Sequence, residues 1–155
     1  MAPFAYPSVA RFSDESCGAY YAAEALGTAV AEVSFHRARF AAKTPTPPMD
    51  FDERIIEADI IADVDDIRGL APNDPMYDVD PANYGHPQAF AGTARGGGSQ
   101  GIVYKSVRSP GGACVAIFIP RLVLNARTAG YIGLRWDGKR ITDSYHKVSL
   151  TTIYP

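Results

Sequence analysis

The segment KTPTPPMD, residues 43–50, divides the sequence into a helical part and a part dominated by strands. Proline lacks an amide donor and its ring clashes with the preceding helical turn, so no helix continues through this segment. Before it, residues 24–43 carry apolar side chains at helical spacing, which predicts an amphipathic helix with Thr28, after Gly27, as its N-cap. After it, residues 54–64 alternate apolar and polar side chains, and this period of two predicts a half-buried strand.

The remaining segments read mainly as short strands joined by turns. We expect strands over residues 18–23, 102–108, 113–120 and 146–154, a loop over residues 65–86 and a short helix over residues 87–95. The dipeptide Asp137-Gly138 indicates a tight hairpin. A helix early in the chain, followed mostly by strands, predicts the α+β class rather than a doubly wound parallel sheet.

Length and composition limit the classes of protein to consider. The 155 residues, of which 46% are apolar and 21% charged, are typical of a globular protein, and we expect one domain over residues 1–155. The net charge is −2 and the basic residues are dispersed, so nothing indicates binding to nucleic acid or to a membrane surface. No signal peptide is visible, and the longest apolar run, CVAIFI, is too short to span a bilayer. We therefore expect a cytoplasmic protein.

The two cysteines, Cys17 and Cys114, lie in unrelated contexts, with no CxxC motif or Cys/His cluster. This pattern argues against a zinc site. Both residues flank apolar stretches, so we expect two buried thiols that stay reduced.

On the predicted helix, Thr28, Glu32 and His36 are four residues apart and form a polar stripe beside the apolar face. Such a stripe by itself is typical of a solvated helix face. A catalytic role requires Glu32 to point into a cleft beside a substrate. A metal site requires a third ligand and the HExxH spacing, and neither is present.

Three further residues each have a structural and a functional interpretation. Arg11 is by default a surface arginine, but its planar fork could grip a phosphate through two parallel bonds. Tyr21 ends an aromatic strand and either packs in the core or stacks on a planar ring. Ser106 has no GxSxG context, which argues against a hydrolase nucleophile.

A glycine turn at residues 96–98 precedes the strand predicted over residues 102–108. The turn could form an anion-binding nest or let the backbone approach a ligand closely. Alternation along the strand predicts that Tyr104, Ser106 and Arg108 share one face, which we expect to border the ligand site.

Together these residues resemble the RES domain family, which is named for its Arg, Glu and Ser. In that family an arginine precedes an aromatic strand end, the next helix carries a glutamate, and a later GI-x-Y-x-S-x-R strand carries a serine. Arg11, Tyr21, Glu32 and Ser106 occur here in that order, in RFS, GAYYAAEALGTAVAE and GIVYKSVR, and IFIP follows. The resemblance covers about residues 10 to 125.

The resemblance implies an α+β fold similar to that of ADP-ribosyltransferases, with mixed sheets and few helices. It implies a toxin of a bacterial toxin–antitoxin pair, whose Xre-like antitoxin blocks the active site. The implied reaction uses NAD⁺ as substrate and no metal: the nicotinamide–ribose bond is cleaved and ADP-ribose passes to an acceptor. A protein acceptor makes the enzyme a transferase, and water or phosphate makes it a glycohydrolase or phosphorylase.

The resemblance also implies roles for individual residues. Glu32 would stabilise the positive charge that develops on the ribose, and Arg11 would hold the pyrophosphate. Tyr21 would stack on nicotinamide or hold the ribose, and Ser106 would bond to the ribose or to the carboxylate. The remaining candidate contacts to NAD⁺ are Thr28, His36 and Arg108.

One feature departs from the family. Its members usually carry another arginine in a strand upstream of the Arg11 position, and residues 1–10 contain none. We expect either an N-terminus that is short relative to the family or a phosphate grip that lacks this arginine. Two other functions stay open: a Mg²⁺-dependent phosphate-ester or nucleotide hydrolase, supported only by the acidic residues 63–66, and a non-catalytic protein-binding module.

Overall fold

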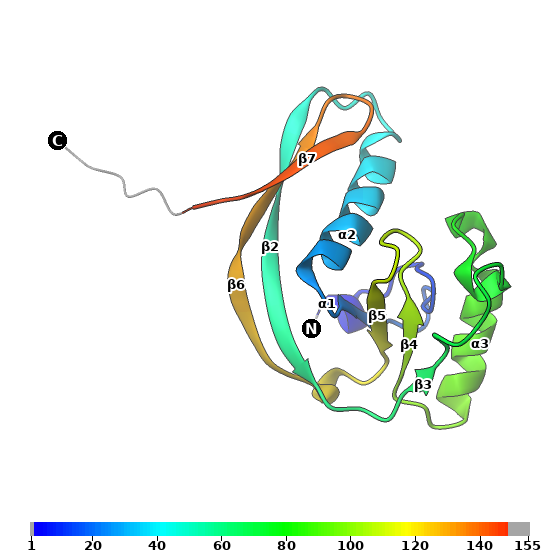
Figure 1. The fold of residues 1–155 in the computed structure, drawn as a ribbon. Coiled ribbons are helices and arrows are strands. Elements are labelled where there is room, and N and C mark those ends of the chain that lie inside the picture. Colours follow the sequence, from blue (N-terminus) through cyan, green and yellow to red (C-terminus); the bar gives the residue numbers. More distant parts are fainter. Residues whose placement is uncertain (1, 149–155) are drawn as a thin grey trace. The chain divides into compact units, whose positions relative to one another are not determined.

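The computed structural model describes residues 2–148, and the chain forms two compact units. Unit 1 contains the residues before 32 together with residues 59–124, and unit 2 contains residues 32–58 together with the residues from 125 onward. The long helix α2 (Leu26–Ala41) begins in unit 1 and ends in unit 2. Figure 1 labels the helices and strands of both units.

A four-stranded sheet forms the centre of unit 1. In spatial order its strands are β1 (Tyr20–Ala23), β5 (Ala113–Ile117), β4 (Gly101–Lys105) and β3 (Asp65–Asp66). β5 pairs antiparallel with both β1 and β4, whereas β3 pairs parallel with β4, so the sheet is mixed. Helix α3 (Gly85–Gly96) lies beside the β3–β4 side of this sheet (Figure 1).

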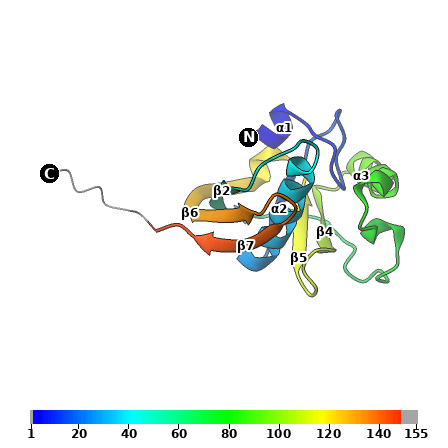
Figure 2. The same cartoon turned by 90° about the horizontal axis from the view of Figure 1, so that it is seen from above.

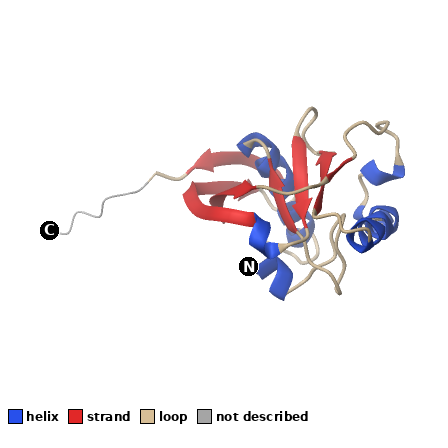
Figure 3. Ribbon diagram, turned by 90° about the horizontal axis from the view of Figure 1, so that it is seen from below, coloured by secondary structure: helices blue, strands red, loops and turns tan. Residues whose placement is uncertain are grey.

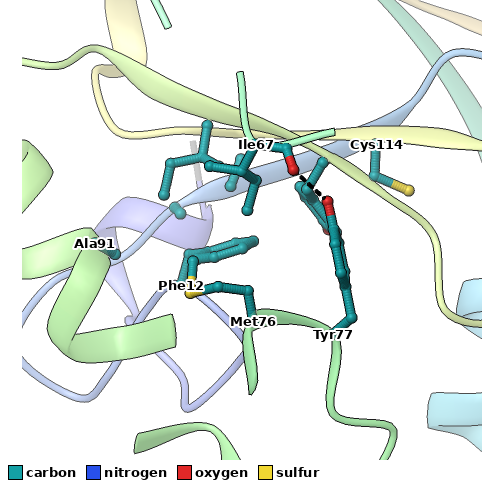
Figure 4. Packing of buried hydrophobic residues seen from close by; sticks show 10 residues of the cluster. Phe12, Ile67, Met76, Tyr77, Ala91 and Cys114 are labelled. Carbon is teal, nitrogen blue, oxygen red and sulfur yellow. Dashed lines mark hydrogen bonds between the residues drawn. The ribbon is translucent and has the colours of Figure 1, made fainter. Parts of the chain in front are cut away.

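The hydrophobic core of unit 1 contains side chains from the sheet, from α3 and from the loops around them. The Phe12 ring is fully buried and meets the Tyr104 ring edge-on, with ring centres 4.9 Å apart. Met76 packs in the same cluster, and the Tyr77 hydroxyl donates a hydrogen bond to the Ile67 carbonyl at 2.6 Å (Figure 4). Phe12 therefore anchors the N-terminal segment of the chain in the core.

A three-stranded sheet forms the centre of unit 2. β6 (Val123–Trp136) lies between β2 (Met49–Ile60) and β7 (Ile141–His146) (Figure 2). Leu134 and Trp136 of β6 are buried. The hairpin turn that leads from β6 into β7 places Gly138 at φ +97°, a conformation that glycine adopts without strain.

The part of α2 that belongs to unit 2 contacts β2. Arg37 forms an ion pair with Glu53, and its guanidinium lies over the Phe51 ring at 5.9 Å from the ring centre. Phe51, Glu53 and Ile55 are half-buried on β2, whereas Asp52 and Arg54 between them are exposed. The period-two alternation of the strand thus turns one face toward the helix.

Several short helices lie in the connecting segments, shown in tan and blue in Figure 3. They are α1 (Ala2–Ala5), η1 (Pro75–Tyr77), η2 (Pro81–Asn83) and η3 (Pro120–Leu122). The aspartates before η1 and η2 cap them, because Asp74 accepts the Met76 amide and Asp80 accepts the Ala82 amide, both at 2.9 Å.

The structure confirms the predicted α+β class with mixed sheets and few helices. The helix expected over residues 24–43 is α2, the strand expected over 54–64 overlaps β2, and the helix expected over 87–95 is α3. The strands expected over 18–23 and 113–120 are β1 and β5. The hairpin expected at Asp137-Gly138 joins β6 to β7.

Three predictions were wrong in detail. The loop expected over 65–86 contains the two residues of β3. Of the strand expected over 146–154, His146 is the last residue of β7, and residues 149–154 lie outside the described residues, so that part stays a prediction. The strand expected over 102–108 ends at Lys105. Cys114 is buried as expected, but Cys17 is exposed, because its amide donates to Asp14 in a surface turn.

Within residues 2–148, no helix is long and apolar enough to cross a membrane.

Candidate active site

Arg11 lies at the corner of a tight turn in unit 1. The turn is closed by the Ala10 amide, which donates to the Ser13 carbonyl at 2.9 Å. Arg11 is 6% exposed, so the surface position expected by default for an arginine is wrong. Its Nη1 donates to the Met76 carbonyl at 2.7 Å and its Nη2 to the Asp78 carbonyl at 2.8 Å. The guanidinium is thus buried and held by two backbone carbonyls of one segment.

The environment of Arg11 leaves its charge without a carboxylate partner. The Tyr84 ring lies against the guanidinium, 4.7 Å from its central carbon. Over the described part of the chain, Arg11 forms no ion pair. Carbonyl dipoles and a ring face stabilise a cation without cancelling its charge. Among the described residues the guanidinium is therefore buried without an ion pair, and its charge acts on the nearby Asp78 carboxylate, whose pKa is lowered by bonds from the Asp80 amide and Asn83 and also by Arg11.

Arg108 bonds to the same backbone segment, but it follows this segment in the sequence, whereas Arg11 precedes it. Its Nη2 donates to the Val79 carbonyl, the neighbour of the Asp78 carbonyl that accepts from Arg11. Two guanidinium groups, from residues 97 positions apart, therefore bind consecutive carbonyls. The structure thus places the guanidiniums of Arg11 and Arg108 on one backbone segment.

Tyr21, on β1, is bonded to the turn that carries Arg11. Its hydroxyl oxygen accepts the Phe12 amide at 2.9 Å and lies 3.1 Å from Ser13 Oγ. The Ser13 hydroxyl donates to the Ser8 carbonyl at 3.0 Å, which leaves Ser13 Oγ free to accept the Tyr21 hydroxyl hydrogen. Burial raises the pKa of Tyr21 above its ordinary value of 10.0, against the opposing effect of these hydrogen bonds, so the phenol stays neutral.

A pocket of about 420 Å³ opens in unit 1 beside this hydrogen-bonded chain. It is lined by Tyr6, Ser8, Ala10, Ser13, Ala19, Tyr20 and Tyr21. Three of these seven side chains are phenol rings and two are hydroxyls. Such a lining suits a planar ring that also carries polar groups.

Ser106 follows β4 and ends it. Its hydroxyl oxygen accepts the Arg108 amide at 3.1 Å and the Ser109 amide at 2.9 Å, which turns the chain after Lys105. Because the strand stops there, the expectation that alternation would place Tyr104, Ser106 and Arg108 on one strand face is wrong. Ser106 is buried, and Arg108 is half-buried beyond the turn.

Thr28 packs against this turn. Its hydroxyl donates to Ser109 Oγ at 3.3 Å, and a Cβ added at Gly112 would lie 2.4 Å from Thr28 Oγ1. Thr28 is the third residue of α2, which begins at Leu26, so the prediction that it is the N-cap is wrong. Its side chain bonds to the turn after β4 instead of to the amides of its own helix. Thr28 thereby joins the first turn of α2 to the Ser106 turn.

Glu32 and His36 follow Thr28 at intervals of four along α2 and belong to unit 2. Glu32 is half-buried and His36 is exposed, with the His36 ring edge-on to Phe35 at 5.4 Å. Of the seven predicted residues, unit 1 thus contains Arg11, Tyr21, Thr28, Ser106 and Arg108. Unit 2 contains the other two.

The glycine turn at residues 96–98, which we expected to approach a ligand, lies away from the Ser106 turn, at the other end of β4. Gly96 is the last residue of α3, Gly97 caps the helix through bonds to Thr93 and Arg95, and Gly98 takes a φ of +89°. The turn therefore ends a helix. It lies at the start of β4, whereas Ser106 lies at the opposite end.

Sequence reasoning missed the Met76–Val79 segment, whose carbonyls hold both guanidiniums. It also missed Ser13, which connects Tyr21 to the backbone, and Gln88 and Arg95 of α3, which bond to the turn that carries Arg11. No local pattern marks a carbonyl as the partner of an arginine that lies more than sixty positions away. Over residues 2–148, no group of three or more His, Cys, Asp or Glu side chains is placed to hold a metal ion.

The family model of the RES domain matches residues 1–137. A search of curated proteins gave no significant match.

Proposed function

The chain belongs to the RES domain family, whose members are in general NAD⁺-processing toxin domains, and from this we propose that it is an NAD⁺-cleaving toxin that transfers ADP-ribose to a protein. In the proposed reaction the bond between ribose C1′ and the nicotinamide nitrogen breaks. Nicotinamide leaves as a neutral ring with the bonding electrons, and the ribose becomes oxocarbenium-like. A nucleophilic side chain of the acceptor bonds to C1′ and loses its proton. We also propose that residues 1–155 act as one domain.

The observation that carries the proposal is the buried guanidinium of Arg11 beside that of Arg108. NAD⁺ contains a pyrophosphate with two negative charges, and arginine forks bind such oxygens with charge-assisted bonds. Arg11 has five N–H donors, and two of them bond to the Met76 and Asp78 carbonyls. The remaining donors, and the absence of an Arg11 ion pair within residues 2–148, support Arg11 as the pyrophosphate ligand, with Arg108 as the second cation.

Tyr21 and the pocket beside it support the binding of a planar ring. We propose that the Tyr21 ring stacks on nicotinamide, because its hydroxyl is already bonded to Phe12 and Ser13. Ser106 and Thr28 would bond to the ribose hydroxyls from the turn after β4. His36 is proposed as a further polar contact from α2.

Glu32 is proposed as the residue that stabilises the reacting centre. A carboxylate beside an oxocarbenium-like carbon lowers the energy of the transition state more than that of the neutral ground state. Glu32 is the carboxylate on the polar stripe of α2, one helical turn after Thr28, and Thr28 bonds to the Ser106 turn. It would also orient the attacking group of the acceptor.

RES domains typically pair with Xre antitoxins. We propose that such a partner covers the NAD⁺ site of this chain, because a host can tolerate an enzyme that destroys a central cofactor only while it is silenced. Direct binding to nucleic acid is not part of the proposal, since the net charge of −2 offers no electrostatic attraction.

The test is to incubate the purified chain, freed of any partner, with NAD⁺ alone, with phosphate and with cell lysate. We expect nicotinamide release in step with transfer of labelled ADP-ribose to a lysate protein. Label in free ADP-ribose or in ADP-ribose-1″-phosphate would assign water or phosphate as acceptor. EDTA should leave the rate unchanged, and dependence on Mg²⁺ would favour the hydrolase alternative.

Glu32→Gln provides the decisive variant, because it removes the charge and keeps the shape. We expect it to release nicotinamide at least about 100-fold more slowly with an unchanged melting temperature. Glu57→Gln is the matched control, since Glu57 pairs with Arg127 on the exposed part of unit 2. Absence of nicotinamide release from folded wild-type protein under every condition would reject the function in favour of a non-catalytic binding module.

A further inference from the structure

Two side chains of α3 hold the turn that carries Arg11. Gln88 donates from its Nε2 to the Ala10 carbonyl at 3.0 Å and to the Ser13 carbonyl at 3.1 Å. These are the two residues whose backbones close the turn. Both N–H groups of one side-chain amide therefore bridge the two ends of the turn.

Arg95 holds the same segment from a second point. Its Nη2 donates to the Phe12 carbonyl at 2.9 Å and to the Gly18 carbonyl at 3.4 Å. Its guanidinium lies over the Phe118 ring at 3.9 Å from the ring centre, which fixes its orientation. Gln88 and Arg95 are seven residues apart, so they share one face of α3 about 10 Å apart along its axis.

The two contacts bracket Arg11 in the chain. Ala10, the residue before Arg11, accepts a hydrogen bond from Gln88 at its carbonyl. Phe12, the residue after Arg11, accepts one from Arg95 at its carbonyl. The Phe12 amide donates to the Tyr21 hydroxyl, so the same turn also sets the position of Tyr21. Both residues proposed to contact NAD⁺ from this side therefore depend on one helix face.

We infer that Gln88 and Arg95 are positioning residues, which orient Arg11 and the Tyr21 hydroxyl for substrate through their bonds to the Ala10–Gly18 backbone. This inference rests on the proposed function for its effect on NAD⁺. The pyrophosphate is remote from the bond that breaks and is bound alike in the ground and transition states. Loss of the positioning should therefore raise KM and leave kcat nearly unchanged.

The test uses two variants of Gln88 in the full chain. Gln88→Ala removes both bonds, and Gln88→Glu keeps the shape but presents an acceptor to two carbonyls. We expect each variant to raise KM for NAD⁺ about tenfold, with kcat within a factor of two. Thr93→Ala is the control on the same helix, because the exposed Thr93 hydroxyl bonds to the Ala89 carbonyl within α3, and it should leave both constants unchanged.

A purely structural role for Gln88 gives a different result. It would lower kcat in proportion to the folded fraction and leave the KM of the remaining folded enzyme as in the wild type. That outcome in both variants would overturn the inference.

A second measurement separates this inference from the proposed function. Hydrogen exchange of the Phe12 amide, followed by NMR, reports whether the turn still holds its bond to Tyr21. We expect the Gln88→Ala protein to exchange this amide at least about tenfold faster, with the Ile102 amide in β4 unchanged. If the wild type does not cleave NAD⁺, the proposed function fails, and the positioning by Gln88 still stands or falls on this exchange rate.

Discussion

The basic side chains of the two units have different partners. In the described part of unit 2, five of them pair with carboxylates: Arg37 with Glu53, Arg127 with Glu57, Arg135 with Asp50, Arg140 with Asp137 and Lys147 with Asp52. In unit 1, Arg11, Arg95 and Lys105 donate to backbone carbonyls, and within residues 2–148 none of these three forms an ion pair. Arg68, which pairs with Asp66 on the surface, is the exception in unit 1.

The two kinds of partner both hold a basic side chain in place but differ in their effect on its charge. A carboxylate fixes a guanidinium and also cancels its charge, whereas a carbonyl fixes it and leaves the charge in place. Unit 2 therefore uses its charges to hold strands and helix together. Unit 1 keeps buried and half-buried positive charge that an anionic ligand can neutralise, and this is where the proposed pyrophosphate ligands lie.

The largest expected effect compares Arg11→Ala in unit 1 with Arg127→Ala in unit 2. Arg11→Ala removes two charge-assisted bonds, so we expect unfolding free energy to fall by about 3 kcal/mol and kcat/KM for NAD⁺ to fall about 100-fold. Arg127 and Glu57 are each more than half exposed, so Arg127→Ala should change stability by less than about 0.5 kcal/mol and leave kcat/KM unchanged.

Urea denaturation and the nicotinamide-release assay measure both effects. Equal losses of kcat/KM in the two variants would show that the contrast between the units has no functional meaning. A loss of stability in Arg11→Ala without any loss of kcat/KM in the folded protein would remove Arg11 from the site.

A smaller effect compares a glycine in each unit. A Cβ at Gly112 would lie 2.4 Å from Thr28 Oγ1, and one at Gly133 would lie 2.2 Å from Tyr145 Cζ. We expect Gly112→Ala to cost about 2 kcal/mol and to lower kcat/KM, because it displaces Thr28 from the Ser106 turn. Gly133→Ala should cost about 1 kcal/mol and leave kcat/KM unchanged, since it displaces the end of the Tyr145 ring.

Gly69→Ala is the control for both variants, because a Cβ there meets nothing within 4 Å. Thermal melts and the NAD⁺ assay are sufficient to separate the three proteins. A drop in kcat/KM for Gly133→Ala as large as that for Gly112→Ala would count against placing the chemistry at the Ser106 turn.

The smallest expected effect concerns Arg68, the exposed arginine of unit 1 that pairs with Asp66. The bond from the Arg68 side chain, with the Arg68 amide, lowers the pKa of Asp66 from 3.8 to about 2. A lowered carboxyl pKa stabilises the fold fully above pH 3.8 and less as the pH falls toward 2. Because both groups are exposed, Arg68→Ala should raise this pKa toward 3.8 without a measurable change in melting temperature.

An NMR titration of the Asp66 carboxyl measures this shift, with Arg121→Ala as the control. An unchanged Asp66 pKa in Arg68→Ala would mean that backbone amides alone hold the carboxylate.

The elements with local signals could be predicted from the sequence. The apolar spacing before the prolines predicted α2, and the alternation after them predicted β2. The family resemblance, which a family model over residues 1–137 confirms, came from short motifs whose order survives without an alignment. These signals need only neighbours in the chain.

The errors at Ser106, Thr28 and Arg11 arose where a side chain bonds to a partner outside the regular hydrogen bonds of its own helix or strand. Ser106 reads as part of an alternating strand, yet its hydroxyl accepts two amides and turns the chain. Thr28 reads as a helix cap, yet it bonds to Ser109, 81 residues away. The carbonyls that hold Arg11 lie 65 and 67 residues away, and carbonyls carry no residue-specific signal. The role of the Met76–Val79 carbonyls in holding the arginines could therefore not be predicted from the sequence.

The bonds around Arg11 join residues that are far apart in the sequence, and this has a consequence during protein synthesis. Arg11 leaves the ribosome many residues before the Met76 and Asp78 carbonyls, and Thr28 leaves long before Ser109. Closing such loops has an entropic cost that is recovered only when the distant partner is present. A nascent chain shorter than about residue 112 therefore cannot assemble the Ser106 turn, because the Ser106 amide bonds to the Gly112 carbonyl, so this wall of the candidate site forms late in translation.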